Sequence, residues 1–484
     1  MVRFSEVTAD LAASKLLRGA GALALAVALA ACATPPAGQT PAQARAPDSF
    51  AAARSFQAPE AAWPAQSWWR AYNDPQLTAL IEEGLQGSPT LAEAQARLRA
   101  ASAAQAAARA AAGPDVTLNA GVREEKQSYN SGIPAAFVPQ GYNDYGRATL
   151  DFAYDLDFWG RNRAAIAAAT SDQRAAEAEA AQARLMLSTA IAEAYADLAR
   201  LTQERAIAAQ ALEVRTQTAT LVGHRVDSGL DTRGELRQAE AGPPAARAQL
   251  AALDEALGAT RNRLSALTGA GPDRGLDIAA PAEVRLTAFG LPPNLGADLI
   301  GRRPDIVAAR WRAEAASARV EGANAAFYPN VNLAAFIGVQ SLGLENLTKS
   351  GSDVGAIAPA LSLPIFDSGR LRANRLRADA ERDAAIAAYN GALSEALHQV
   401  ADVVTSERAL STRLTESRDA LSAYEDAYRI ARLRYEGGLS NYQAVLIAED
   451  AVLQQRLAVA DLEARAFTLD VALVRALGGG YSAS

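Results

Sequence analysis

The chain alternates between two kinds of hydrophobic periodicity, and each kind occurs twice along its 484 residues. Apolar and polar residues alternate one by one in segments 116–123, 147–158 and 331–339, and more briefly at Leu361, Leu363 and Ile365. This period predicts four β-strands. Strands of about ten residues with one apolar face are typical of a transmembrane barrel. A soluble sheet over a core has the same pattern, and four strands are too few to close a barrel alone.

Long stretches with helical periodicity follow each pair of strands. In the second half of the chain, Ile386, Tyr389, Leu393, Ala396, Val400 and Val403 recur at steps of three and four. The matching positions in the first half are Leu187, Ile191, Ala194, Leu198 and Leu201. This heptad spacing predicts coiled coils. A helix over 161–225 would extend about 100 Å at about 1.5 Å per residue, so it requires partner helices along its length.

The chain is internally duplicated. Segment 89–120 aligns with 304–335 at a shift of 215 residues, and later landmarks align at a shift of 209. These landmarks are the glycine pairs Gly160 and Gly369, Gly229 and Gly438, and Gly269 and Gly478. Each copy is predicted to contain a helix, a strand, a loop, a strand, a very long helix and a return helix. Gly229 and Gly438 are placed to reverse the chain between the last two helices.

The N-terminus has the features of an export signal. Arg3, Lys15 and Arg18 precede a short apolar run over 19–31, and the run ends in Leu29-Ala30-Ala31-Cys32. This sequence resembles a bacterial lipobox, in which Cys32, the only cysteine of the chain, would be lipidated. The alternative is an ordinary signal peptide with an incidental cysteine. The lipoprotein pattern associates Ala33 after the cysteine, rather than Asp, with delivery to the outer membrane.

Composition and motifs argue against an enzyme. A net charge of −7 gives no reason to expect nucleic acid as a partner. We find no phosphate-binding loop, dinucleotide fingerprint, metal-ligand cluster or nucleophile elbow, so we expect no cofactor and no metal. His224 and His398 lie on helical segments without a partnering acid pattern.

Two sets of polar residues are candidate functional sites. Asp151, Asp155 and Asp157 share the polar face of one predicted strand, where they could line a water-filled lumen or simply keep that face polar. The second set surrounds the two predicted hairpin turns, where polar residues are also expected without any function. Its members are Gly229, Asp231, Arg233, Glu235, Tyr435, Gly438 and Ser440.

Several motifs resemble those of TolC-type outer-membrane factors. They are Trp68-Trp69, Asp74-Pro75, the segment from Asp155 to Arg161 (DLDFWGR), and the turns Gly229-Leu230 and Gly438-Leu439. With the lipobox, the chain is similar to the NodT-like lipoprotein branch of efflux-system channels. The resemblance implies a mixed fold, in which a membrane β-barrel continues into a long α-helical coiled-coil barrel. It also implies a homotrimer in which each chain gives four strands to one twelve-stranded barrel.

The function implied by the resemblance is passive conduction from the periplasm to the exterior. The duct would dock a periplasmic adaptor protein and an inner-membrane pump of the resistance–nodulation–division class, and its barrel would contact outer-membrane lipid. The alternative is a periplasmic coiled-coil scaffold or adaptor lipoprotein without a pore.

The same resemblance implies a gate at the periplasmic tip. Tyr435 matches a tyrosine of the family's closing network, and Glu235 matches the acid that it meets. Ser440 stands where the best-known member has an arginine, and Ala444 and Ile447 replace its acidic rings, so a cation preference is not implied. Gly242-Pro243-Pro244 is expected to kink the return helix of the first copy.

These observations predict seven segments. They are a signal peptide (1–31), a lipidated tether (32–64), an equatorial segment (65–88), the first copy (89–269), an equatorial linker (270–302), the second copy (303–478) and a tail (479–484).

Lipidation of Cys32 is directly testable. Intact-mass analysis of the mature protein should show a diacylglyceryl-type adduct on an N-terminal Cys32, because the short apolar run ends at a lipobox-like sequence. An unmodified N-terminus at another residue would contradict this prediction.

Overall fold

The computed structural model describes residues 42–46, 49–52, 54–130, 132–281, 289–293 and 295–483. Residues 1–31 and Cys32 lie outside this part, so the expected signal peptide and lipid site have no structural description. The described chain forms two compact units, and each unit takes segments from both sequence copies. The first holds residues 42–43, Arg99–Arg174 and Arg310–Ala387, and the second holds Ala44–Leu98, Ala175–Ala309 and Ala388–Ser484.

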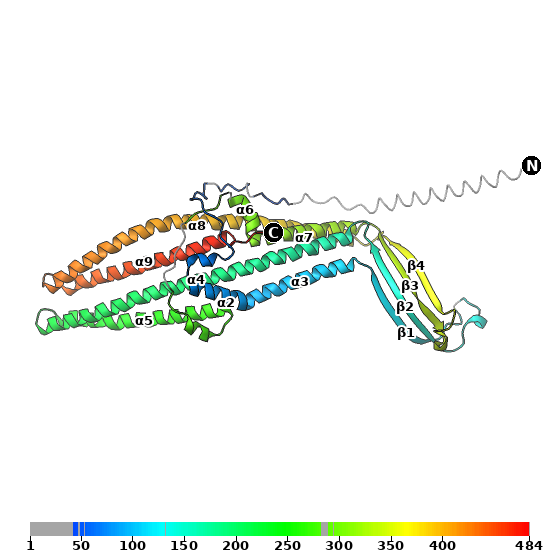
Figure 1. Ribbon diagram of the computed structural model, residues 1–484, viewed down its shortest axis with the longest axis horizontal. Helices are drawn as coiled ribbons and strands as arrows, with labels where there is room; N and C mark the ends of the chain where they lie inside the picture. Colours follow the sequence, from blue (N-terminus) through cyan, green and yellow to red (C-terminus); the bar gives the residue numbers. More distant parts are fainter. Residues whose placement is uncertain are drawn as a thin grey trace, which may run out of the picture. The chain divides into compact units, whose positions relative to one another are not determined.

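The first unit contains one antiparallel sheet of four strands in the order β1-β2-β3-β4 (Figure 1). The strands are β1 (Asp115–Glu125), β2 (Asn143–Leu156), β3 (Asn330–Leu342) and β4 (Asp353–Ser362). The prediction of four strands is confirmed. The fourth strand lies earlier than expected, because it ends at Ser362 and leaves Leu363 and Ile365 beyond it. Pro364 has no N–H to donate to a ladder, which is consistent with the early end.

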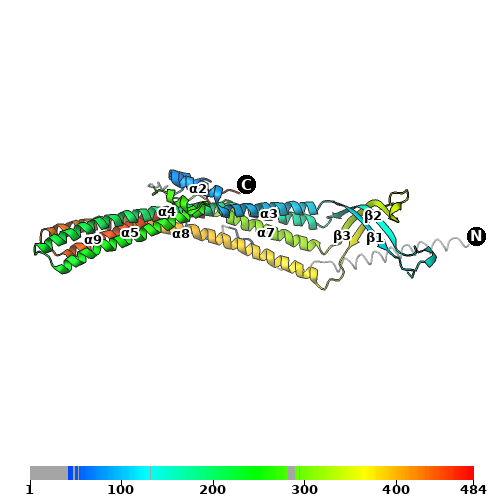
Figure 2. The same ribbon diagram turned by 90° about the horizontal axis from the view of Figure 1, so that it is seen from below.

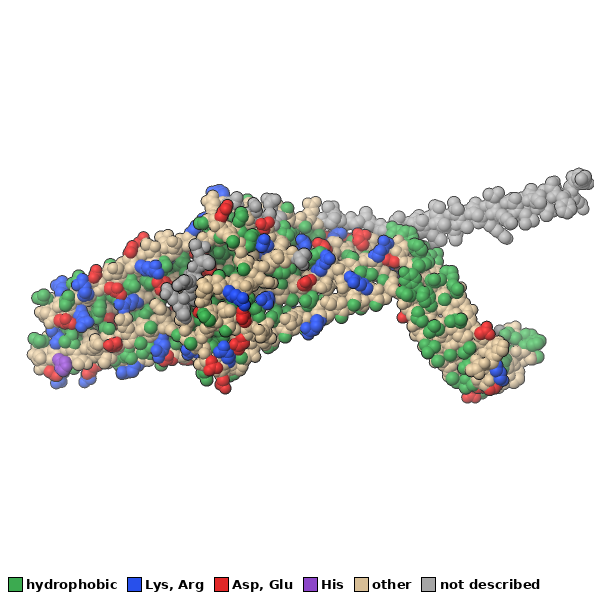
Figure 3. Space-filling model, in the orientation of Figure 1, with side chains coloured by type: hydrophobic (Ala, Val, Ile, Leu, Met, Phe, Trp, Pro, Cys, Tyr) green, Lys and Arg blue, Asp and Glu red, His purple; other side chains and the backbone are tan. Residues whose placement is uncertain are grey.

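The register of the sheet gathers apolar side chains on one face. Leu118 is opposite Leu150, and Leu150 is opposite Ile337, so one apolar row crosses three strands. These side chains are 71%, 47% and 69% exposed in the single chain. Figure 3 shows hydrophobic side chains covering much of the strand region. A contiguous exposed apolar surface of this kind marks a membrane or protein contact.

The helices follow the predicted order in each copy. Short α2 (Pro75–Gly87) is followed by α3 (Pro89–Ala111), α4 (Arg161–Asp227) and α5 (Arg233–Thr268); α6 (Leu295–Arg302) precedes α7 (Pro304–Ala325), α8 (Arg370–Glu436) and α9 (Tyr442–Ala476). Helices α4 and α8 are each 67 residues long. Figures 1 and 2 both show α4 beside α5 and α8 beside α9, so each long helix returns as a hairpin. None of the helices in the described ranges is long and apolar enough to cross a membrane.

The predicted coiled-coil seam is buried over its central part. Leu187, Ile191, Ala194, Leu198 and Leu201 of α4 are all buried, and so are Tyr389, Leu393, Ala396, Val400 and Val403 of α8. Ile386 is only half-buried, and Tyr424, at which the same helical spacing continues beyond Val403, is exposed in the single chain. The central part of the heptad pattern therefore identifies the core of the second unit. The residues toward the two ends of the pattern remain exposed or half-buried in the single chain, where partner helices could cover them.

Asp74 fixes the short helix α2 to this core. Its carboxylate accepts hydrogen bonds from the backbone N–H groups of Gln76 and Leu77 at 2.8 and 2.9 Å, which caps the helix. The same carboxylate accepts a 2.7 Å hydrogen bond from the hydroxyl of fully buried Tyr195 on α4. Burial, together with this bond, raises the pKa of Tyr195. The Asp74-Pro75 motif thus joins the equatorial segment to the long helices.

The duplication extends to backbone conformation. The paired glycines all have positive φ: 81° and 85° at Gly160 and Gly369, 71° and 73° at Gly229 and Gly438, and 80° and 88° at Gly269 and Gly478. At Gly269 a β-carbon would also lie 2.3 Å from the carbonyl oxygen of Gly87. Only glycine satisfies both requirements where α5 ends against α2.

We predict that Gly269→Ala lowers the thermal stability of the second unit. The added methyl group collides with the backbone of Gly87 and strains a left-handed residue, a cost of about 1–3 kcal/mol. Gly271→Ala is the matched control, because Gly271 has φ −71° and a β-carbon added there would meet no atom within 4 Å. Circular dichroism melting should show a lower midpoint for Gly269→Ala alone. Equal midpoints for the two variants would contradict the prediction.

Candidate functional site at the hairpin tips

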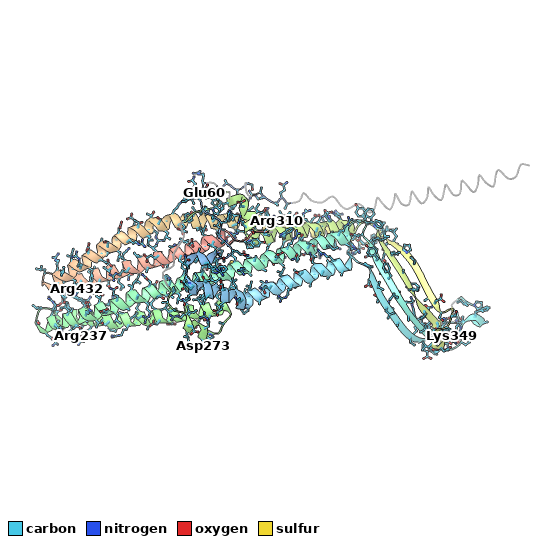
Figure 4. All side chains as sticks on the ribbon, viewed as in Figure 1. Glu60, Arg237, Asp273, Arg310, Lys349 and Arg432 are labelled. Carbon is cyan, nitrogen blue, oxygen red and sulfur yellow. The ribbon has the colours of Figure 1, made fainter. Side chains whose placement is uncertain are left out.

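The two long hairpins turn at Gly229 and Gly438 with the same local geometry. The N–H of Leu230 donates to the carbonyl of Arg225 at 2.8 Å, and the N–H of Leu439 donates to that of Arg434 at 2.7 Å. Each left-handed glycine closes this helix-terminating bond. The following helices begin at capping residues, Thr232 for α5 and Asn441 for α9. In Figure 4, labelled Arg237 and Arg432 lie near the two turns.

A network of three side chains joins the first hairpin to the second. Arg225, near the end of α4, donates from Nε to the Asp231 carboxylate at 2.9 Å and from Nη2 at 3.4 Å. The Tyr435 hydroxyl of α8 donates a short hydrogen bond to the same carboxylate. The Arg225 guanidinium also lies 4.5 Å from the centre of the Tyr435 ring. The Asp231 carboxylate therefore accepts hydrogen bonds both from Arg225 of its own hairpin and from Tyr435 of the other hairpin.

The network is shielded from water by an apolar cluster. Tyr435 of α8 is 1% exposed and packs with Val222 of α4, Ala239 of α5, and Tyr442 and Val445 of α9. The side chains of Arg225 and Asp231 are 13% and 6% exposed. Charge-assisted hydrogen bonds in such surroundings are stronger than those at a wet surface.

The electrostatics favour an ionised Asp231. Burial alone would raise the pKa of this carboxyl, but the hydrogen bonds from Arg225 and Tyr435 and the arginine's charge hold it below its usual value. Burial and the negative charge of Asp231 raise the pKa of Tyr435, so its hydroxyl remains a donor. Burial likewise raises the pKa of neighbouring Tyr442 to about 12.

The expected pairing of Tyr435 with Glu235 is wrong in this chain. Glu235 accepts hydrogen bonds at 2.8 Å from the backbone N–H of Thr232 and at 2.9 Å from its hydroxyl. It therefore completes a capping box at the start of α5, where unpaired N–H groups attract a carboxylate. Asp231, four residues earlier and outside the helix, is the acid that meets Tyr435.

The remaining candidates at the tips differ in their surroundings. Arg233 is exposed. Ser440 has a buried hydroxyl oxygen without a hydrogen-bond partner among the described residues. Arg225 was missed by the sequence analysis, although a basic residue in the last turn of a helix and an acid just after the turn are a recognisable pair.

The three aspartates of the second strand do not form one set. Asp151 accepts hydrogen bonds from Asn119 at 2.8 Å and Thr149 at 2.9 Å, and Asp155 forms a 3.2 Å ion pair with Arg161. Asp157 lies beyond the end of β2. Its carboxylate accepts from the backbone N–H groups of Asn162 and Arg163 at 3.1 and 2.9 Å, so it caps α4 and does not belong to the strand face.

The DLDFWGR motif therefore builds the junction between strand and helix. Trp159 stacks on Tyr328 of the second copy at 4.6 Å between ring centres, and its indole N–H donates to the carbonyl of Pro329 at 2.9 Å. The motif ties the ends of β2 and α7 together through contacts that both copies supply.

The described ranges contain no group of three or more His, Cys, Asp or Glu side chains that could hold a metal ion. The arrangement at the tips is one of ion pairing and hydrogen bonding between helices.

Comparison with known proteins identifies the family. The sequence pattern described as "Outer membrane efflux protein" matches residues 80–270 and 295–479. The chain belongs to this family. It is 31% identical over 431 residues to the multidrug resistance outer membrane protein MdtP of Shigella flexneri, with 88% of each chain covered.

Solved structures agree with this assignment. The outer membrane protein VceC of Vibrio cholerae superimposes with a TM-score of 0.83 at 47% identity, covering 87% of this chain and all of VceC. The open state of the Neisseria gonorrhoeae channel MtrE gives a TM-score of 0.76 at 26% identity, covering 92% of this chain and 97% of MtrE. The family resemblance and the mixed fold are thus confirmed.

The chain is therefore an outer-membrane exit duct of a tripartite efflux system. Its homologues are channel proteins of the outer membrane that extend into the periplasm, and they are not enzymes. Outer-membrane efflux channels are homotrimers that work with periplasmic adaptors and inner-membrane pumps. This assignment favours a duct over the alternative of a scaffold without a pore.

The lowered pKa of Asp231 predicts how the tip responds to acid. Its ionised form is stabilised, so the contribution is fully present above its ordinary pKa of about 3.9 and is lost as pH falls through the lower folded value. Hydrogen–deuterium exchange of tip peptides should be slower in wild type than in Asp231→Asn at about pH 5–7, with the difference vanishing on further acidification. Comparing the two proteins at the same pH cancels the pH dependence of the intrinsic hydrogen-exchange rates. No difference at neutral pH would contradict the role of this carboxylate.

Proposed function

We propose that this chain forms a lipid-anchored homotrimeric duct that is held closed at its periplasmic end by the Arg225–Asp231–Tyr435 network. The observation that carries the proposal is the placement of Asp231, which binds residues of both hairpins of one chain. The remaining tip candidates, Gly229, Gly438, Arg233, Glu235 and Ser440, shape or surround the two turns. Opening then requires the hairpins to separate and the network to break.

The lipid anchor rests on the sequence ending at Cys32 and on the segment that follows. The backbone N–H of Ala42 donates to Asp383 of α8 at 3.3 Å, within the first unit. In the second unit, the N–H of Arg45 donates to Asn390 of the same helix at 2.8 Å. These contacts hold Ala42 and Arg45, two residues of the proposed tether (32–64), against α8. A signal peptide over 1–31 would precede this tether. The partner set that we propose includes outer-membrane lipid, an adaptor and a pump of the resistance–nodulation–division class.

For the lumen, Asp151 and Asp155 are the proposed acidic residues, because both belong to the polar face of β2. Asp151 accepts hydrogen bonds from the neutral side chains of Asn119 and Thr149, and Asp155 is paired with Arg161. The proposed conduction is passive and requires no cofactor.

The gate proposal predicts the effect of removing the shared carboxylate. Asp231→Asn combined with Tyr435→Phe should raise single-channel conductance or open probability in planar bilayers. A hydrogen bond to a charged group contributes about 1.5–3 kcal/mol, so losing it in each copy should raise the open population by at least about tenfold. Glu235→Gln is the control, since Glu235 serves the α5 cap and not the link between hairpins.

The expected pattern is a leaky double variant beside a Glu235→Gln variant that conducts like wild type. If the double variant conducts like wild type while Glu235→Gln leaks, the closing contact lies at Glu235 and the proposal for Asp231 fails.

A further inference from the structure

A cavity of about 330 Å³ lies within the second unit, between α4, α8 and α9. Ile207, Ala211 and Val214 of α4 and Val452 and Leu453 of α9 form its apolar lining. Tyr428 of α8 supplies an aromatic ring, and Glu449 of α9 supplies a carboxylate. Apolar walls with a few convergent polar groups are characteristic of sites for small organic molecules.

Glu449 is the unusual member of this lining. The residue is 7% exposed, and Arg215 donates from Nε to its Oε1 at 3.1 Å. Its second oxygen, Oε2, is buried and has no hydrogen-bond partner among the described residues. A buried carboxylate oxygen left without a donor is unfavourable, so a ligand that supplies a donor there would be bound with a gain in free energy.

The cations near the cavity are all engaged by carboxylates. Glu425 and Glu449 line the cavity together with Arg456, and Asp450 lies outside the lining with a side chain that is 55% exposed. Arg215 is shared between Glu449 and Asp450, which it meets at 3.0 Å, and Arg456 is paired with Glu425 at 2.7 Å. The one arginine that reaches Glu449 is therefore shared with Asp450, and it donates to Oε1 and not to Oε2.

The Gly242-Pro243-Pro244 segment of α5 lies beside Arg215. Helix α5 continues through both prolines, and Pro243 is buried. The stem of Arg215 passes beside Gly242, where a β-carbon would lie 3.4 Å from its Cδ. The arginine is therefore seated between α5 and α9, with its guanidinium engaged by Oε1 of Glu449 and by Asp450.

We propose that this cavity is a binding site for a small amphiphilic organic cation, whose ammonium group binds Oε2 of Glu449 while its hydrocarbon part packs between α4 and α9. The ring of Tyr428 adds a favourable aromatic surface for the cation. None of its lining residues belongs to the Arg225–Asp231–Tyr435 network, although Tyr428 packs against the apolar cluster that shields that network.

The test compares two probes of nearly equal shape, 2-phenylethylammonium and neutral 2-phenylethanol. Isothermal titration at neutral pH uses the full-length protein in detergent, with blank titrations into detergent alone. Wild type should bind the ammonium probe at least about tenfold more tightly than the alcohol, because a charge-assisted bond to a buried carboxylate is lost in the neutral compound. Equal affinities would overturn the proposal.

Two variants locate the preference. Glu449→Gln keeps the size of the side chain and should abolish the preference for the cation, whereas Asp461→Asn, at an exposed position of the same helix, should retain it. A preference that survives in Glu449→Gln would overturn the site. If Glu449→Gln does not assemble, Val452→Trp serves instead: it fills the cavity and should weaken both probes, and unchanged binding of the ammonium probe would again refute the proposal.

Discussion

The structure of this chain depends on one constraint, which is the closure of its four-stranded sheet. The outer strands β1 and β4 leave rows of backbone N–H and C=O groups unpaired, and the apolar face across Leu118, Leu150 and Ile337 is exposed. In a membrane such groups must be paired within protein, so an open sheet is not viable there. Four strands are fewer than the roughly eight that a barrel requires. The missing partners must therefore come from further copies of the chain.

The topology makes such closure possible without any rearrangement. Because successive strands are antiparallel, β1 and β4 run in opposite directions, and β4 of one copy can pair antiparallel with β1 of the next. Each copy then contributes two long helical hairpins. Their tips are chemically different although they arose from the same duplicated unit. Asp231 of the first hairpin and Tyr435 of the second form a link that identical hairpins would not make.

Much of the fold could be read from the sequence because it depends on periodicity. The strand alternation, the heptad seam around Leu198 and Leu393, and the left-handed glycines at 229 and 438 are local signals, and the structure contains all of them. The strand end at Ser362 was missed because the apolar alternation continues past it to Ile365, whereas the partner strand β3 begins at Asn330, opposite Ser362.

The details of the sites were harder, because they depend on which donors compete for each carboxylate. Glu235 and Asp231 are both acids close to the same turn. The start of α5 takes Glu235 into its cap, which leaves Asp231 for Arg225 and Tyr435. Asp157 is similarly taken by the start of α4. Sequence spacing alone does not decide this competition, whereas the positions of the helix ends do.

The most direct test of the account is to determine how many copies of the chain form the assembly. Single-particle electron microscopy of the full-length protein in detergent should show three-fold symmetric particles with one barrel, to which every copy contributes its four strands. A ring of any other order, or copies with separate barrels, would contradict the account of closure on which the tunnel and its tip depend.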